Sequence, residues 1–179
     1  MVSLDDKKFK KLIYLKETTE TRQLVDGDKV VVSFTGSRQD DEYMDELAKL
    51  SFKVTEKDLA DRRDLRDMEI FTIDGDDTKD IDDGISTKKL KNGNYELGVH
   101  IADVSYYIPE NSALDIEARS RGTSTYLVDR VIPMFHHQIS NGICSLNPDE
   151  DRLTISCVME ISPEGKLVKY DIFPSVIHS

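Results

Sequence analysis

The sequence has no hydrophobic segment long enough to cross a bilayer, and it has only two cysteines. A membrane-spanning helix needs about 20 consecutive, mostly apolar residues, so we expect no membrane association. Cys144 and Cys157 lack the spacing of a metal or redox motif and are expected to be small apolar residues in a reducing compartment. Residues 1–8 contain no apolar core of a signal peptide. We therefore expect a cytoplasmic location.

An excess of positive charge is also absent. The chain has 24 Lys and Arg residues against 35 Asp and Glu residues, a net charge of −11 over 179 residues. Affinity for nucleic acids usually comes from Lys and Arg side chains that neutralise phosphates. The composition therefore argues against a general polyanion binder, and a nucleic-acid role would require bound metal ions, a local basic patch or basic segments outside this chain.

What the sequence does have is a dense group of carboxylates at residues 74–83. Its acidic members are Asp74, Asp76, Asp77, Asp80, Asp82 and Asp83. Like charges at this density favour a solvated loop, whereas Mg²⁺ and Mn²⁺ prefer oxygen ligands. An EF-hand is excluded, because placing Gly84 at its sixth position would put Lys79 at the first. A solvated acidic loop and an open site for a hard divalent cation both remain open.

Hydrophobic patterns and turn signals predict an α+β fold, with a mixed, mostly antiparallel sheet and packed helices. Capping-box spacing predicts helix starts at Thr55 and Ser112, the second helix ending at Gly122. The strands are expected at residues 29–34, 69–73, 84–90, 95–106, 153–161 and 166–177.

The dipeptide Asn92-Gly93 predicts a tight hairpin between two of these strands. With this dipeptide at the centre of the turn, Asp82 pairs with Asp103 and Ile85 pairs with His100. That register would bring the Asp103 carboxylate to the edge of the acidic segment. Satisfied structural roles are nevertheless expected for His100 and Asp103.

Several sequence blocks carry a resemblance to a known family. They are residues 63–67, 73–83, 98–107, 121–127, 129–134, 139–148 and 151–154. In this order they resemble the start of the catalytic domain of the ribonuclease II/ribonuclease R family, with a closer likeness to the ribonuclease R branch. The resemblance covers about residues 62–179.

The resemblance implies a hydrolase that degrades single-stranded RNA from its 3′ end and releases nucleoside 5′-monophosphates. The family's active-site aspartates, which bind Mg²⁺ with Mn²⁺ as a substitute, match Asp74, Asp80, Asp82 and Asp83. Asp82 matches the carboxylate most critical to the chemistry, and no other small-molecule cofactor is implied. Tyr126 matches an aromatic residue that stacks on terminal RNA bases.

The resemblance also divides the chain. Residues 1–37 resemble the tail of a cold-shock OB domain, 38–66 are expected to be a helical linker, and 67–179 the N-terminal part of an RNB ribonuclease domain. The family's remaining RNA-binding and catalytic positions find no match here. We therefore expect a truncated and inactive portion of the exoribonuclease, or alternatively a non-catalytic RNA- or protein-binding module on the same scaffold.

Overall fold

A computed structural model describes residues 2–3, 12–13, 38–128 and 131–179. The chain divides into two compact units, residues 1–35 and 36–179. In the first unit, β1 (Val2–Ser3) pairs antiparallel with β2 (Leu12–Ile13). The strand predicted at 29–34 lies outside the described residues, as does most of the predicted cold-shock remnant.

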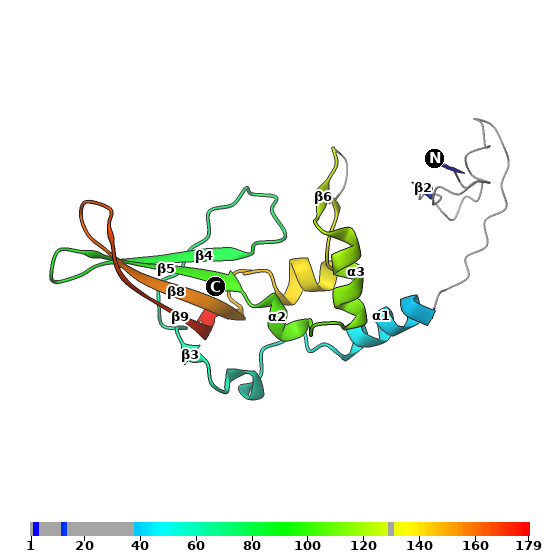
Figure 1. Ribbon diagram of the computed structural model, residues 1–179, viewed down its shortest axis with the longest axis horizontal. Coiled ribbons are helices and arrows are strands. Elements are labelled where there is room, and N and C mark those ends of the chain that lie inside the picture. Colours follow the sequence, from blue (N-terminus) through cyan, green and yellow to red (C-terminus); the bar gives the residue numbers. More distant parts are fainter. Residues whose placement is uncertain (1, 4–11, 14–37, 129–130) are drawn as a thin grey trace. The chain divides into compact units, whose positions relative to one another are not determined.

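The second unit is built on a five-stranded sheet in the order β3-β9-β8-β5-β4 (Figure 1). Its strands are β3 (Arg63–Asp64), β4 (Asp83–Lys89), β5 (Tyr95–Ala102), β8 (Asp151–Ile161) and β9 (Leu167–His178). Only β3 and β9 pair in parallel, and the other neighbours in this sheet are antiparallel. The predicted α+β class is confirmed.

Short helices gather at one end of this sheet (Figure 1). They are α1 (Arg38–Lys49), the 3₁₀ helix η2 (Glu56–Leu59), α2 (Val104–Tyr107), α3 (Ala113–Arg121) and the π-helical turn η3 (Ile139–Ile143). A small hairpin of β6 (Thr125–Tyr126) and β7 (Val131–Ile132) follows α3. None of the helices in the described part of the chain has the length and apolarity to cross a membrane.

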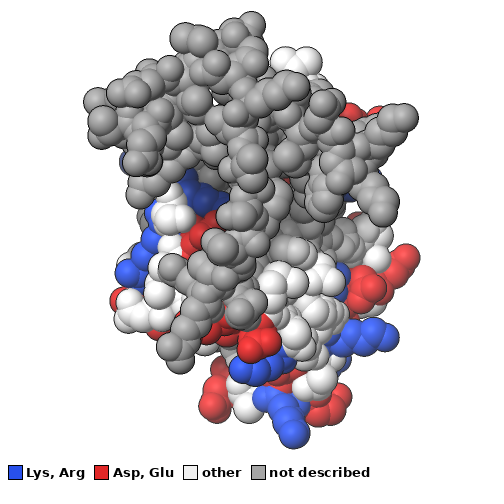
Figure 2. Space-filling model, turned by 90° about the vertical axis from the view of Figure 1, so that its right-hand side faces the viewer, with Lys and Arg blue, Asp and Glu red and all other residues white. Residues whose placement is uncertain are grey.

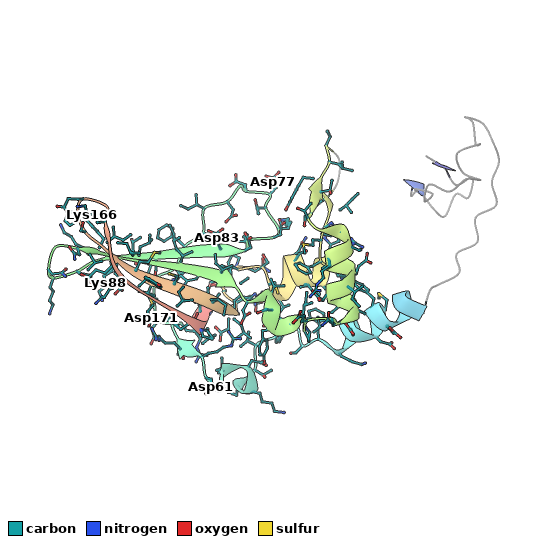
Figure 3. The ribbon with its side chains drawn as sticks, viewed as in Figure 1. Asp61, Asp77, Asp83, Lys88, Lys166 and Asp171 are labelled. Atoms are coloured by element: carbon teal, nitrogen blue, oxygen red, sulfur yellow. The ribbon has the colours of Figure 1, made fainter. Side chains whose placement is uncertain are left out.

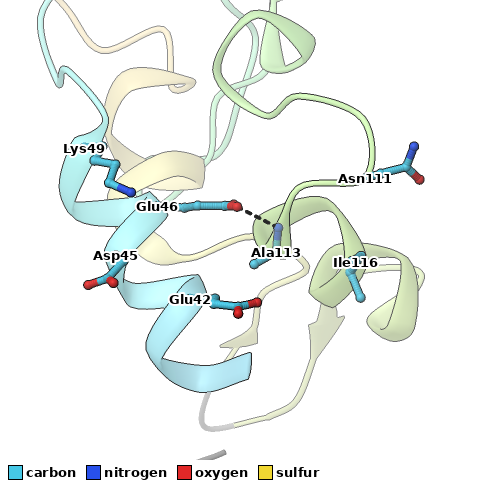
Figure 4. A pocket seen from close by; sticks show the side chains of 7 residues that line it. All are labelled: Glu42, Asp45, Glu46, Lys49, Asn111, Ala113 and Ile116. Carbon is cyan, nitrogen blue, oxygen red and sulfur yellow. Dashed lines mark hydrogen bonds between the residues drawn. The ribbon is translucent and has the colours of Figure 1, made fainter. Parts of the chain in front are cut away.

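Helix α3 forms where its capping residues predict it. The Ser112 side chain accepts a hydrogen bond from the amide of Asp115, and Gly122 ends the helix at a φ of 74°. Glu46 of α1 adds a second cap, since its carboxylate accepts the amides of Ala113 and Leu114 (Figure 4). These contacts satisfy amides that the first turn of a helix leaves without partners.

The hydrophobic core lies between the helices and the end of the sheet at which they gather. Its buried side chains include Leu47, Leu114, Ile139, Leu146, Leu153, Val176 and Ile177. Leu47 is 2% exposed and belongs to α1, so this helix packs into the same core as the strands. An ion pair between Arg62 and Asp103, 2.7 Å apart and almost fully buried, fixes the entry to β3 against the end of β5.

The predicted register of the β4–β5 hairpin is wrong by one residue. Asp83 pairs with Ile101 and Gly84 with His100, so Asp103 does not face Asp82. The loop has three residues rather than two, because the amide of Gly93 bonds to the Leu90 carbonyl and Gly93 takes a φ of 90°. A slip of one residue reverses the faces of all paired side chains.

His100 lies inside the sheet in a network of hydroxyl groups. Its ring nitrogens lie 3.0 Å from the Ser86 hydroxyl and 2.7 Å from the Ser156 hydroxyl. Ser175 and Thr154 continue the chain of hydrogen bonds. The network joins β4, β5, β8 and β9. His100 therefore has the structural role expected for it, and Asp103 has one in its ion pair with Arg62.

Candidate functional site

The acidic segment is a loop that leads into β4. The strand predicted at 69–73 is reduced to one antiparallel bridge, between Phe71 and Ile85, and Ile73 beyond it is 81% exposed. A turn closed by the Thr78 amide and the Gly75 carbonyl follows. Figure 3 places Asp77 in this loop and Asp83 at the start of the strand.

A buried serine fixes the second half of the loop. The Ser145 hydroxyl donates to the Lys79 carbonyl at 3.0 Å and accepts from the Ile81 amide at 3.1 Å. The Ile81 carbonyl in turn accepts the amide of Leu146. Asp80 lies between these anchored groups, so its backbone is held by the segment that follows η3.

An open cavity of about 900 Å³ lies beside this loop. The loop contributes Asp77, Asp80 and Asp82, and Tyr126 of β6 also lines it. Further wall residues are Gly122, Thr123 and Ser124 at the end of α3, Pro133, Met134 and Phe135 after β7, and Ser140, Asn141 and Cys144 around η3. The cavity thus combines carboxylates with an apolar wall.

Tyr126 reaches the acidic loop directly. Its hydroxyl donates a hydrogen bond to a carboxylate oxygen of Asp80. This bond, followed by partial burial and the charges of Asp80 and Asp82, raises the pKa of Tyr126 above its usual value of 10.0. The phenol is therefore protonated at neutral pH and acts as a donor. Its ring stays 64% exposed and faces the cavity.

The structure brings together only part of the predicted site. Asp80, Asp82 and Tyr126 line one cavity, whereas Asp74 and Asp83 are exposed and do not line it. Across the described ranges, no three Asp, Glu, His or Cys side chains lie close enough together to hold a metal ion. The oxygen donors suit Mg²⁺ chemically, but the four aspartates are not assembled around one point.

Lys79 also lines the cavity, whereas two arginines of α3 pair with acidic residues of the same helix. Arg119 pairs with Asp115 at 2.9 Å and Arg121 pairs with Glu117 at 2.9 Å. Arg130 lies outside the residues that the structure describes. On the visible part of the face in Figure 2, basic and acidic side chains are interspersed instead of forming one basic patch.

The sequence did not reveal the anchoring role of Ser145, and the four aspartates matched to the family do not include Asp77, which lines the cavity. The signal for Ser145 was its place in the block 139–148, directly before an apolar residue. That block carried the family resemblance but did not reveal that its serine meets a loop 66 positions earlier.

Comparison with known proteins now identifies the domain. Residues 62–179 match the RNB domain family. The chain belongs to this family. Ribonuclease R of Thermotoga maritima is 58% identical over 139 residues, which are 78% of this chain and 20% of that protein. The expected resemblance to ribonuclease R is confirmed.

Solved RNB structures share the fold. Mycoplasma genitalium RNase R in complex with double-stranded RNA has a TM-score of 0.72 and 37% identity, over 78% of this chain and 25% of that chain. The same protein with ribose-methylated single-stranded RNA gives a TM-score of 0.71 at 37% identity, over 78% and 22%. The chain spans only about a fifth to a quarter of the length of these relatives.

Proposed function

We propose that this chain is the part of a 3′-to-5′ exoribonuclease that carries its acidic catalytic loop. The substrate is single-stranded RNA, and the products are nucleoside 5′-monophosphates. The observation that carries the proposal is the RNB match over residues 62–179, in which Asp80, Asp82 and Tyr126 line one cavity. The solved structure of the M. genitalium relative with ribose-methylated single-stranded RNA supports the class of substrate.

The proposal gives the aspartates the task of holding Mg²⁺. Asp80 and Asp82 already line the cavity, Asp74 would join them by movement of the loop, and Asp83 follows Asp82 at the start of β4. The chemistry that Mg²⁺ supplies in such sites is activation of water and stabilisation of charge on phosphate oxygens. Ser145 anchors one end of the loop, and Asp74 at the other end is exposed. The exposed end could therefore move toward a bound cation while the anchored end stays in place.

The aromatic and apolar walls suit a nucleotide. A base that stacks on the exposed Tyr126 ring would gain about 1–3 kcal/mol without sequence preference. The 900 Å³ cavity is large enough for a small-molecule-sized ligand. Under the same proposal, residues 67–179 form the N-terminal part of the RNB domain, residues 38–66 connect to it, and residues 1–37 end a preceding cold-shock domain.

Two measurements test this function. Titration calorimetry of the 179-residue chain with Mn²⁺ is expected to detect binding that Asp82→Asn weakens. For activity, residues 62–179 replace the matching segment of T. maritima ribonuclease R. This chimera is expected to shorten 5′-labelled oligo(A) stepwise with Mg²⁺ and to release 5′-AMP. Asp82→Asn is expected to reduce the rate by about 100-fold or more.

Asp76→Asn provides the matched control, since Asp76 belongs to the same loop but does not line the cavity. It removes one negative charge and should leave shortening within about twofold of the unsubstituted chimera. Equal losses in both variants would show that the loop's total charge matters and that no specific site exists. RNA binding without metal and without shortening would favour the non-catalytic module.

A further inference from the structure

One face of the five-stranded sheet is apolar along β5, β8 and β9. Side chains alternate between the two faces of a strand, and paired residues share a face. The register sets Leu97 opposite Met159 and Met159 opposite Tyr170. The term apolar face is used below for the surface that includes Tyr95, Leu97, Ile101, Met159, Tyr170 and Ile172.

Little covers this surface in the described part of the chain. Tyr170 is 63% exposed and Ile172 is 60% exposed, on the part of β9 that pairs with β8 alone, because β3 pairs only with Ser175 and Val176. In Figure 1 the helices of the second unit lie beyond one end of the sheet, so none of them covers its far half. The opposite face holds the buried His100 network.

An exposed apolar sheet face of this kind normally marks a site where another layer packs. The two relatives indicate the source of that layer. Four fifths of T. maritima ribonuclease R and three quarters of the M. genitalium RNase R chain lie outside the segments aligned with this chain. The RNB family model matches residues 62–179, which contain all five strands of this sheet, so the covering layer can come from the relatives' remaining residues.

We propose that the apolar face binds a segment of RNB-family polypeptide from outside the stretch aligned with this chain. The segment presents aliphatic and aromatic side chains to Tyr170, Ile172 and their neighbours. A second copy of this chain is a poorer occupant, because two chains of net charge −11 repel each other. The inference rests on family membership and does not depend on catalysis.

Cys157 is a native probe of this surface. It pairs with Ile172 in the register and is partly exposed, so it lies on the apolar face. Cys144 is an internal reference, since it is only 5% exposed at the wall of the cavity and burial raises the pKa of its thiol to about 12. The chain has no other cysteine.

The test compares thiol labelling in the 179-residue chain and in the T. maritima chimera described above, with labelled peptides assigned by mass spectrometry. Cys157 is expected to react at least about tenfold more slowly in the chimera, because the covering segment must open first. Cys144 is expected to react slowly in both proteins. Equal labelling of Cys157 in both proteins would overturn the proposal.

A pair of variants adds a second measurement. In the chimera, Ile172→Glu is expected to lower the melting temperature by several degrees, because it places a charge in a covered apolar contact. Lys88→Glu introduces the same side chain at an exposed position of the opposite face, at the far end of the sheet (Figure 3). Its cross-strand partner is Glu96, so a small loss from like charges is expected, less than the loss in Ile172→Glu. Equal effects of the two variants would contradict the proposal.

Sedimentation velocity of the 179-residue chain tests whether the occupant is a second copy of the chain. A dimer that Ile172→Glu abolishes would make a second copy the partner. The outcome is also separable from the proposed function. An active chimera with unprotected Cys157 would contradict this inference alone. An inactive chimera with protected Cys157 would contradict the catalytic proposal alone.

Discussion

The Tyr126 hydroxyl and the Asp80 carboxylate are joined by a hydrogen bond of 2.5 Å between the β6–β7 hairpin and the acidic loop. A cation that binds Asp80 competes with the hydroxyl for the same oxygen atoms. Tyr126→Phe removes the donor and keeps the ring. We expect it to tighten Mn²⁺ binding by about two- to tenfold, since a net hydrogen bond contributes about 0.5–1.5 kcal/mol. Titration calorimetry of the chain measures this change.

Tyr106→Phe is the matched control for this prediction. The Tyr106 hydroxyl also donates to a carboxylate, that of Asp58, and this bond raises the pKa of Tyr106 in the same way. Neither Tyr106 nor Asp58 lines the cavity. Tyr106→Phe should leave Mn²⁺ affinity unchanged. Weaker binding after Tyr126→Phe would mean that the hydroxyl helps the cation instead of competing with it.

Ser145→Ala tests the anchor of the acidic loop. The substitution leaves the Ile81 amide and the Lys79 carbonyl without their buried partner, at a cost of about 1–3 kcal/mol. Because these groups flank Asp80, we expect both a lower urea midpoint and weaker Mn²⁺ binding. Denaturation curves and calorimetry on the same samples measure the two effects.

Ser156→Ala separates loop anchoring from general destabilisation. Ser156 is as buried as Ser145, but it bonds to His100 and Ser175 inside the sheet. We expect a similar loss of stability with no change in Mn²⁺ affinity. If both variants weaken Mn²⁺ binding equally, the effect comes from stability and the anchor has no specific role.

The sequence was a good guide where structure depends on nearby residues. The α3 helix begins after Ser112 and ends at Gly122 as their capping preferences predict, and the β8–β9 pair follows from alternation. The β4–β5 register failed by one residue, because Asn92-Gly93 is compatible with either a two- or a three-residue loop.

The candidate site was less predictable for a physical reason. Asp80, Asp82 and Tyr126 were singled out from the family resemblance, and the structure places all three around one cavity. The contacts that hold the site are long-range. Ser145 meets Lys79 across 66 positions and Arg62 meets Asp103 across 41, and no local pattern encodes such pairs.

Arg62→Met is expected to destabilise the fold strongly. The guanidinium pairs with Asp103 and also donates to the carbonyls of Thr154 and Ser175, so its loss leaves a buried carboxylate without its cation. Breaking one half of a buried ion pair costs about 3–5 kcal/mol. Urea denaturation followed by circular dichroism gives the free energy of unfolding.

Arg119→Met removes the same type of side chain from an exposed pair with Asp115 and is expected to cost at most about 1 kcal/mol. A small effect of Arg62→Met, comparable to that of Arg119→Met, would show that Asp103 finds another partner. Its neighbour Ser105, which already donates to Asp103, is the group that would compensate.

The last prediction concerns pH and His100. Burial lowers the pKa of this imidazole below its usual 6.5, so the folded state keeps it neutral while the unfolded chain takes up a proton below that pH. The unfolded state then binds more protons, and stability falls as the pH drops from 6.5 toward the folded pKa. We expect His100→Gln to flatten the pH dependence of the urea midpoint in this window. Identical slopes for His100→Gln and the unsubstituted chain would place the acid sensitivity in another group.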